Sequence, residues 1–271
     1  MGRKYSPEVL ITMFAAYFDE SGGKDTGFTF VCGYTATVAK WSAFEFDWKL
    51  FLATFRVPYL HMKEFSQSKK CYSTWRDNGT LRAQFLGMAS EITRSHLQRA
   101  FIGMVSHDGF DKADLKYKLR ERFNSPYALA GRTCVALANN RAKESKNGAL
   151  AIEYIFEDGC PDKEGLIKAV EAVPPFLPAP SFKPSRDVKP SKNWPEGRIG
   201  LVQLQAADYL AYETGKLLRD LYLIRSGERE VRKSLKALTK VPVDRSSWGE
   251  VRLMQMCEGA KFARKDGGYR V

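Results

Sequence analysis

Two apolar segments of this chain end in the same way, in a pair of acids followed by turn residues that include glycine. Phe14 to Phe18 runs into Asp19-Glu20 and a Ser-Gly-Gly turn, and Ala149 to Phe156 runs into Glu157-Asp158 and a glycine. Short apolar runs bounded by turn residues are typical of buried β-strands. Functional sites of α/β proteins collect at strand ends, so the two acidic pairs meet if the strands are neighbours in one sheet.

Adjacent residues of a strand point to opposite faces of the sheet, so we expect one carboxylate of each pair to project directly into such a site. Acids at turns also cap local backbone N–H groups, and either pair alone is compatible with that structural role.

The rest of the chain alternates between strand and helix patterns. β-Branched and aromatic runs predict two further strands, at 28–38 and 99–107, the first of them paired as a hairpin with the strand at 14–18. Apolar residues at helical spacing predict helices at 41–55, 81–92, 126–143, 163–173 and 199–224. This order favours an α/β fold, a mixed sheet with helices packed on both faces.

A proline-rich segment interrupts this pattern. Seven of the 12 prolines lie between Pro174 and Pro195, which excludes a continuous helix or an interior strand there and leaves room for a short edge strand near 181–182. We expect a single domain over 1–271. It would include a Pro-rich basic loop at 174–198 and a basic helical C-terminal extension at 226–271.

Composition narrows the cellular setting and the partners. Lysine and arginine exceed the acids by 43 − 31 = 12, which suits a polyanion such as nucleic acid, although many basic proteins are merely soluble cations. No run approaches the roughly 20 apolar residues that span a bilayer, so we expect no membrane partner. The five cysteines are scattered and odd in number, which argues against a disulfide framework and favours a reducing, cytoplasmic location.

The helix at 199–224 carries a carboxylate on an apolar surface. Gln205 and Asp208 lie one turn apart, in a helix that is apolar over most of its circumference. A buried carboxylate needs a cation, a donor or a metal, and no lysine or arginine lies within one turn of Asp208. Oxygen ligands suit Mg²⁺ or Mn²⁺, so we expect Asp208 to join the strand-end acids in a metal site.

Two further groups could serve such a site. His61 could transfer a proton or be structural, Lys63 could meet phosphate, and Glu64 could add a ligand. The Pro-rich loop places basic residues between Phe182 and Trp194, a combination that either contacts nucleic acid or forms a solvated surface; these are Lys183, Arg186, Lys189 and Lys192. We interpret the later basic run at 225–240 as a solvated helix face.

Four motifs together resemble the domain-of-unknown-function family 3800. They are YFDESG at 17–22, LHMKEF at 60–65, FEDG at 156–159 and LQAADYLAY at 204–212. The resemblance spans roughly residues 14 to 225. It implies a ribonuclease H-like fold and metal-dependent nucleic-acid chemistry, in a bacterial or phage-derived protein.

The leading hypothesis is therefore a phosphodiesterase that acts on DNA or RNA. We assign the metal-ligand role to Asp19, Asp158 and Asp208. Glu20 or Glu157 would be an auxiliary ligand or base, and Gln205 would hold a carboxylate or a metal-bound water. Two alternatives remain, a nucleic-acid- or partner-binding protein without turnover, and a metal-dependent hydrolase of nucleotides or other phosphate esters.

Overall fold

The computed structural model describes residues 13–23, 26–144, 152–171, 178–192, 194–223 and 232–260. Within these residues, six strands form one mixed sheet in the order β5-β4-β1-β2-β3-β6. The strands are β1 (Phe14–Gly23), β2 (Phe28–Thr37), β3 (Arg99–Ser106), β4 (Ile152–Glu157), β5 (Ser181–Lys183) and β6 (Val243–Trp248).

The predicted hairpin is confirmed, but its first strand is longer than predicted. β1 and β2 pair antiparallel from Phe14 opposite Thr37 to Gly23 opposite Phe28. β4 pairs parallel to β1 only as far as Phe18 opposite Phe156. After Phe18, the acids and glycines of β1 no longer pair with β4, but they remain part of a strand because their backbone groups still pair with β2.

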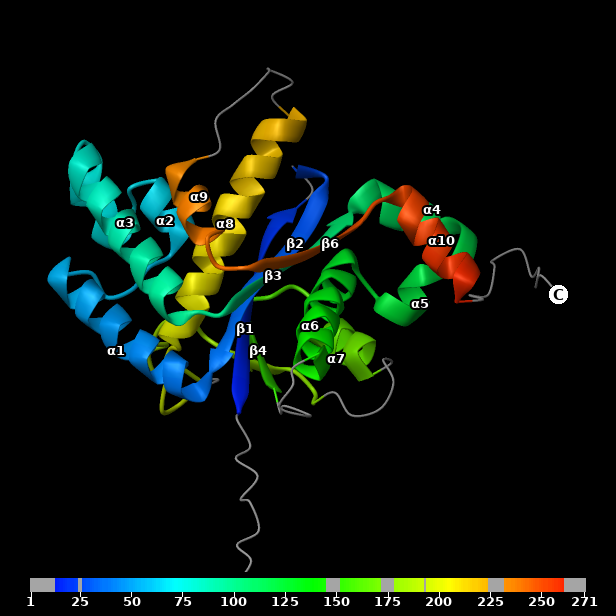
Figure 1. Cartoon of the computed structure of the whole chain (residues 1–271), viewed down its shortest axis with the longest axis horizontal. Helices are drawn as coiled ribbons and strands as arrows, with labels where there is room; N and C mark the ends of the chain where they lie inside the picture. The colour runs from blue at the N-terminus through cyan, green and yellow to red at the C-terminus, as the bar shows by residue number, and fades with distance from the viewer. Residues whose placement is uncertain are drawn as a thin grey trace, which may run out of the picture.

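Helices cover both faces of this sheet, as the sequence predicted (Figure 1). One face carries α1 (Val38–Thr54), α2 (Met62–Ser66), the 3₁₀-helix η2 (Lys70–Trp75), α3 (Gly79–His96), α8 (Val202–Leu223) and α9 (Lys233–Leu238). The other carries α4 (His107–Tyr117), α5 (Leu119–Phe123), α6 (Pro126–Glu144), α7 (Lys163–Glu171) and α10 (Glu250–Gly259). Each face packs its own apolar cluster, so alternate residues of β1 enter different cores.

The Pro-rich segment contains the short edge strand that the sequence allowed. β5 pairs in parallel with β4 at the end of the sheet. Beyond it, two isolated bridges fold the segment on itself, Val188 with Arg198 and Ser191 with Trp194. Residues 174–177 and 193 of the predicted loop lie outside the described residues.

The structure corrects the sequence prediction for the C-terminal part of the chain. In place of a purely helical extension, the described residues 232–260 contain β6 between α9 and α10, and β6 extends the sheet beside β3. Its sequence, VDRSSW, is mostly polar and half exposed, so it carries little of the apolar signal that identifies an interior strand. Among the described helices, none is both long and apolar enough to cross a membrane.

Candidate metal centre at the acidic strand ends

The acids of β1 and β4 lie where the parallel pairing of these two strands stops. The last paired residues are Phe18 and Phe156, so Asp19 and Glu157 come next on each strand. Each shares a face with the residue two before it, and both of those residues pack against the core cluster that includes α8. The sheet thus turns Asp19 and Glu157 toward the helix that carries Asp208.

Glu20 lies on the other face of β1, as expected for adjacent residues of a strand. Burial and the nearby Glu157 raise the pKa of Glu20 to about 7. Glu20 therefore remains within electrostatic range of the first face although it points toward the second. We call Asp19, Glu20, Glu157 and Asp208 the acid cluster.

The members of the acid cluster oppose one another's ionisation. Burial, followed by the charges of Asp208, Glu20 and Glu157, raises the pKa of Asp19 well above its usual range. Burial also raises the pKa of Asp208 to about 7, where a hydrogen bond from the Met62 N–H opposes the rise. Like charges in a desolvated site disfavour ionisation. Each carboxylate of the cluster that ionises therefore adds negative charge that the neighbouring acids cannot balance.

Two carboxylate oxygens of the cluster are buried without a protein donor. Asp208 Oδ2 accepts from the Met62 N–H at 2.7 Å, and Asp19 Oδ1 accepts from the Glu20 N–H at 2.8 Å. In contrast, Oε2 of Glu20 and Oε2 of Glu157 are buried without a hydrogen-bond partner. Buried polar atoms are nearly always satisfied, so these two oxygens call for a cation or a ligand.

The donor set fits a hard divalent cation in chemistry and charge, because it consists of carboxylate oxygens alone. It is not a preformed ligand cage. Within the described residues, no three His, Cys, Asp or Glu side chains are placed to hold a metal ion. The acids would have to move closer together around an ion, whose positive charge would offset the repulsion that opposes this approach.

Asp158 is held away from the acid cluster, in contrast to the role that the sequence suggested. Its carboxylate pairs with Lys163 and with Arg198, and these contacts lower the pKa of Asp158 despite its partial burial. Glu157, one residue earlier, takes the place expected for Asp158. Strand alternation anticipated that only one of the two would enter the site, but the sequence did not show which.

Gln205 ties the elements around the site together. Its Oε1 accepts from the Trp48 indole N–H and from the Leu60 N–H, each at 2.9 Å. Its Nε2 donates to the Ser185 carbonyl at 2.8 Å. Gln205 therefore positions α1, the LHMKEF segment and the Pro-rich segment around α8. Its oxygen accepts two hydrogen bonds and its Nε2 donates one, none of them to an acid of the cluster, so the predicted role of holding a carboxylate or a metal-bound water stays a prediction.

Glu64 is the centre of a second buried acidic site. It accepts hydrogen bonds from Tyr59 (2.8 Å), Lys70 (2.7 Å) and Arg186 (3.0 Å). His61 Nδ1 lies 3.4 Å from the same carboxylate. These partners overcome burial and lower the pKa of Glu64 to about 2. We call these five residues the Glu64 hub.

Of the basic residues predicted to meet nucleic acid, Arg186 belongs to the hub and the lysines do not. Arg186 lies 5.1 Å from the centre of the Tyr59 ring. Burial is the main cause that lowers the pKa of His61. The lysines proposed to meet nucleic acid remain exposed; these are Lys63, Lys183, Lys189 and Lys192.

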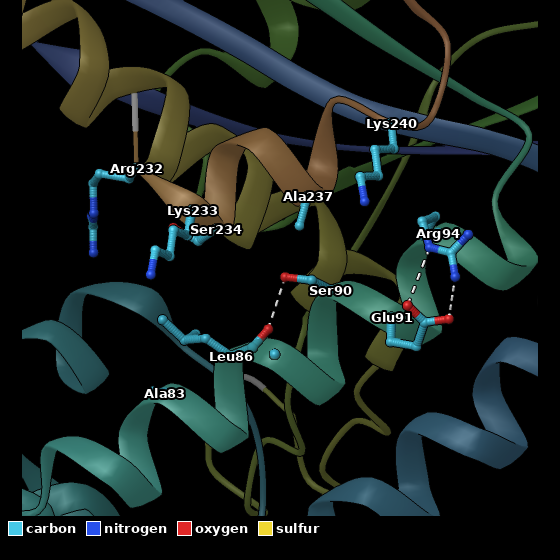
Figure 2. Close-up of a pocket in the computed structure, with 11 residues that line it drawn as sticks. Ala83, Leu86, Ser90, Glu91, Arg94, Arg232, Lys233, Ser234, Ala237 and Lys240 are labelled. Carbon is cyan, nitrogen blue, oxygen red and sulfur yellow. Dashed lines mark hydrogen bonds and ion pairs between the residues drawn. The ribbon is translucent and has the colours of Figure 1, made fainter. Parts of the chain in front are cut away.

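The sequence interpretation missed a basic pocket between α3 and α9. The pocket measures about 570 Å³, and four cations line it: Arg94, Arg232, Lys233 and Lys240 (Figure 2). Arg94 pairs with Glu91 within the pocket wall, and Arg232 pairs with the buried Glu213 at 3.1 Å. The described part of the basic run interpreted as a solvated face, residues 232–240, thus lines a concave surface, which could be found only once α3 was placed opposite α9; residues 225–231 of the run lie outside the described residues.

Comparisons of the chain with protein-family models, with curated proteins and with solved structures found no match. The fold and the site together define an α/β protein with a partly buried cluster of acids at the strand ends of its sheet. The resemblance to the domain-of-unknown-function family 3800 stays a prediction from the four motifs.

Proposed function

We propose that this chain is a divalent-metal-dependent nuclease whose catalytic centre is the acid cluster. The observation that carries the proposal is a set of four carboxylates whose pKa values are all raised, by burial first and, for three of them, by the charges of other members of the set; two of the four have a buried oxygen that has no donor. The four motifs that resemble family 3800 support the same chemistry, and so does the α/β fold with helices on both faces.

Each residue of the cluster has a role in this proposal. Asp19, Glu157 and Asp208 would hold Mg²⁺ or Mn²⁺, since they face one another across β1, β4 and α8. When bound, such an ion supplies a nucleophile at neutral pH and stabilises charge on the leaving oxygen. Glu20, with its pKa raised to about 7, is suited to exchange a proton near neutral pH.

The surroundings of the cluster would bind and orient the substrate. Arg186 is the cation whose charge reaches Glu157, and its guanidinium can pair with a phosphate in two parallel hydrogen bonds. Gln205 keeps Arg186's segment in place through the Ser185 carbonyl. Burial lowers the pKa of His61, and its imidazole, in the Glu64 hub, is a further group that could transfer a proton.

The net charge of +12 and the basic surfaces support a nucleic-acid substrate. The exposed lysines of the Pro-rich segment and the pocket of Figure 2 offer positive charge on the outside of the fold. If both contribute, each neutralised phosphate changes the slope of log K against log salt by about 0.7 to 0.9. A Lys233→Ala/Lys240→Ala variant should therefore bind with a smaller salt slope.

A non-hydrolytic nucleic-acid-binding protein is the second candidate. The observation that favours it is the lack of a preformed three-residue ligand set within the described residues. Such a protein would keep the basic surface and its salt dependence but would show no turnover.

One paired experiment separates the two candidates. Cleavage of single- and double-stranded DNA and RNA is measured with Mg²⁺ or Mn²⁺, and thermal melting with and without metal, for wild type and Asp208→Asn. Asparagine keeps an oxygen for the Met62 N–H, so the variant should fold, and neutralising one acid relieves repulsion. We expect cleavage to fall at least about 100-fold, since the ion supplies several kcal/mol.

The melting arm tests metal binding independently of turnover. A ligand at 100 times its Kd stabilises the fold by about 2.7 kcal/mol, so wild type should melt several degrees higher with metal, and Asp208→Asn should lose most of that shift. If wild type cleaves nothing and its melting ignores metal, the binding protein is the correct reading.

A further inference from the structure

The Pro-rich segment carries two aromatic rings among its basic residues, and the structure gives the two rings different surroundings. Phe182 packs against the core of the α6 face, with its ring 6.2 Å from the ring of Phe156 and 5.7 Å from the Lys163 ammonium. Trp194 lies on the outside and is 47% exposed. Of the two rings, that of Trp194 is therefore the one that can contact a molecule outside the fold.

Arg198 lies against the Trp194 ring and supports it. The central carbon of its guanidinium is 4.4 Å from the centre of the ring, and the arginine side chain is itself only 15% exposed. The same guanidinium donates to the Phe182 carbonyl at 3.2 Å, and the Asp158 carboxylate balances its charge. Cation–π attraction to a buried arginine holds the ring in one orientation and leaves its exposed part for a ligand.

Backbone hydrogen bonds also hold Trp194 in place. Its N–H donates to the Ser191 carbonyl at 3.0 Å, and its carbonyl accepts from the N–H groups of Ser191 and Gly197, each at 2.9 Å. Gly197 has a φ of +72°, and a Cβ there would lie 2.6 Å from the Val188 carbonyl oxygen, so this turn requires glycine. Val188 and Arg198 exchange two further backbone hydrogen bonds, at 2.8 and 2.9 Å. The ring is thus preorganised without depending on any one ion pair, which lowers the entropy cost of binding to it.

The segment that carries Trp194 begins and ends near the acid cluster. Lys183 of β5 is paired in register with Glu157 of β4, which belongs to the cluster. The Leu201 N–H, directly before α8, donates to the Pro184 carbonyl at 2.8 Å and so brings the two ends of the segment together. A polymer bound at the cluster therefore has the ring of Trp194 within reach along its length.

The charge around Trp194 favours a polyanion. Residues 181–200 include five lysines and arginines against two acids. Arg186 and Arg198 are paired with acids, whereas the three lysines are exposed and form no ion pair within the described residues; these are Lys183, Lys189 and Lys192. Ammonium groups beside an exposed ring are the combination that binds single-stranded nucleic acid, the backbone by charge and a base by stacking. In a duplex the bases stack on one another, so the ring can stack only on an unpaired base.

We propose that Trp194 stacks on an unpaired base of a single-stranded nucleic acid, so that the substrate of the acid cluster is a single strand or an unpaired strand end. The cleavage of that strand at the cluster rests on the proposed function. The strand would place one phosphate at the cluster and a nearby base on the ring.

The test uses a second tryptophan–arginine pair as its control. Trp248 of β6 lies 4.4 Å from Arg252, at the opposite edge of the sheet from β5. Binding of fluorescein-labelled oligothymidylate of about 15 nucleotides, and of its duplex with oligodeoxyadenylate, is measured by anisotropy in EDTA, at a temperature where circular dichroism shows every variant folded. We expect Trp194→Ala to bind the single strand at least about 10-fold more weakly, Trp194→Phe to stay within about threefold of wild type, and Trp248→Ala to equal wild type.

The duplex and the salt dependence separate stacking from charge. Trp194→Ala should bind the duplex as wild type does, because paired bases offer no free face to the ring. Its slope of log K against log salt for the single strand should also equal that of wild type, since no phosphate contact is removed. Lys189→Ala/Lys192→Ala should instead lower that slope.

Tryptophan fluorescence locates the contact independently of affinity. Trp41, Trp48 and Trp75 are buried, so among the tryptophans a base can stack only on Trp194 or on the half-buried Trp248. Unlabelled oligothymidylate should quench the fluorescence of wild type and of Trp248→Phe. Trp194→Phe should still bind but should lose the quenching, a result that a merely structural role of Trp194 does not give.

Four results would each overturn the proposal. They are single-strand binding by Trp194→Ala equal to wild type, an equal loss of single-strand and duplex binding in that variant, quenching that persists in Trp194→Phe, and no binding of single strand by wild type. These readouts need neither metal nor cleavage, so they remain decisive if the nuclease proposal fails. Conversely, cleavage that depends on Asp208 while Trp194→Ala binds single strand normally would disprove the stacking role alone.

Discussion

Two acidic sites lie close together in this fold, the single buried carboxylate of the Glu64 hub and the four partly buried carboxylates of the acid cluster, and their pKa values shift in opposite directions. In the Glu64 hub, two cations and a tyrosine surround one acid and lower its pKa to about 2. In the acid cluster, burial and neighbouring acids raise the pKa values of Glu20 and Asp208 to about 7. The charge of Glu64 even adds to the rise at Asp208, so the two sites are near neighbours.

This contrast shows that the fold supplies cationic partners to a buried acid when that acid has a structural role. Asp158 makes the same point, because Lys163 and Arg198 pair with it one residue after Glu157. The nearest charged neighbours of Asp19 are instead other acids. Four acids gathered in that way cost stability and suggest selection for a ligand rather than for folding.

The adjacent acids Glu157 and Asp158 test whether an acid of the cluster differs in function from an acid in an ion pair, and this test has the largest expected effect. Glu157→Gln removes a charge from the acid cluster, so cleavage of nucleic acid should fall at least about 100-fold at constant metal concentration. Asp158→Asn removes a charge of equal size from an ion pair outside the cluster. Its cleavage should stay within about threefold of wild type, because the pair is structural.

Both variants are assayed under identical conditions, with melting temperatures measured in EDTA. Glu157→Gln should melt no lower than wild type, and Asp158→Asn should melt lower. Equal losses of cleavage in the two variants would remove the distinction between cluster and ion pair.

A smaller effect is expected in the hub. Glu64→Gln leaves Lys70 and Arg186 without their charged partner, and should lower the free energy of unfolding by about 1–2 kcal/mol, since both cations remain partly exposed and can be hydrated. Urea unfolding in EDTA measures this loss, and Lys49→Gln, which breaks an exposed pair with Glu45, is the control. A Glu64→Gln variant as stable as wild type would show that the hub contributes nothing to folding.

The two regions should also respond to pH with opposite sign. Glu20 and Asp208 have raised pKa values in the folded state, so the metal-free protein loses stability as pH rises from about 4 to about 7. Glu64 has a lowered pKa, so its contribution is present above about pH 4.5 and is lost as pH falls toward 2. Urea unfolding in EDTA between pH 5 and 8 should show a falling free energy, and Asp208→Asn should flatten it. A rise over that range would contradict the assignment.

The sequence predicted the fold where the local pattern was strong. Apolar runs located β1 and β4, and apolar residues at helical spacing located α6, which begins at Pro126 as predicted; the Ser125 hydroxyl accepts from the Ala128 N–H at its start. β6 was not predicted, because its polar sequence gives no local strand signal. It forms a strand by pairing with β3, which is far away in the sequence.

The candidate site was predicted in part for the same reason. Asp19 and Asp208 were identified from local sequence, because each is an acid on an apolar element. Choosing Glu157 over Asp158 required the positions of Arg198 and Lys163, and the role of Gln205 required Trp48. Such partners far apart in sequence are set by the tertiary fold, and one sequence does not reveal them.

Binding of Mn²⁺ to the acid cluster tests the central claim most directly. Paramagnetic resonance reports free Mn²⁺ at pH 8, so a titration gives the Kd for wild type, Asp208→Asn and Asp158→Asn without any substrate. We predict saturable binding by wild type and by Asp158→Asn, with a Kd at least about 10-fold higher for Asp208→Asn, because removing one ligand charge costs over 1.4 kcal/mol. Wild-type protein that binds no Mn²⁺, or that binds it no better than Asp208→Asn, would contradict the account.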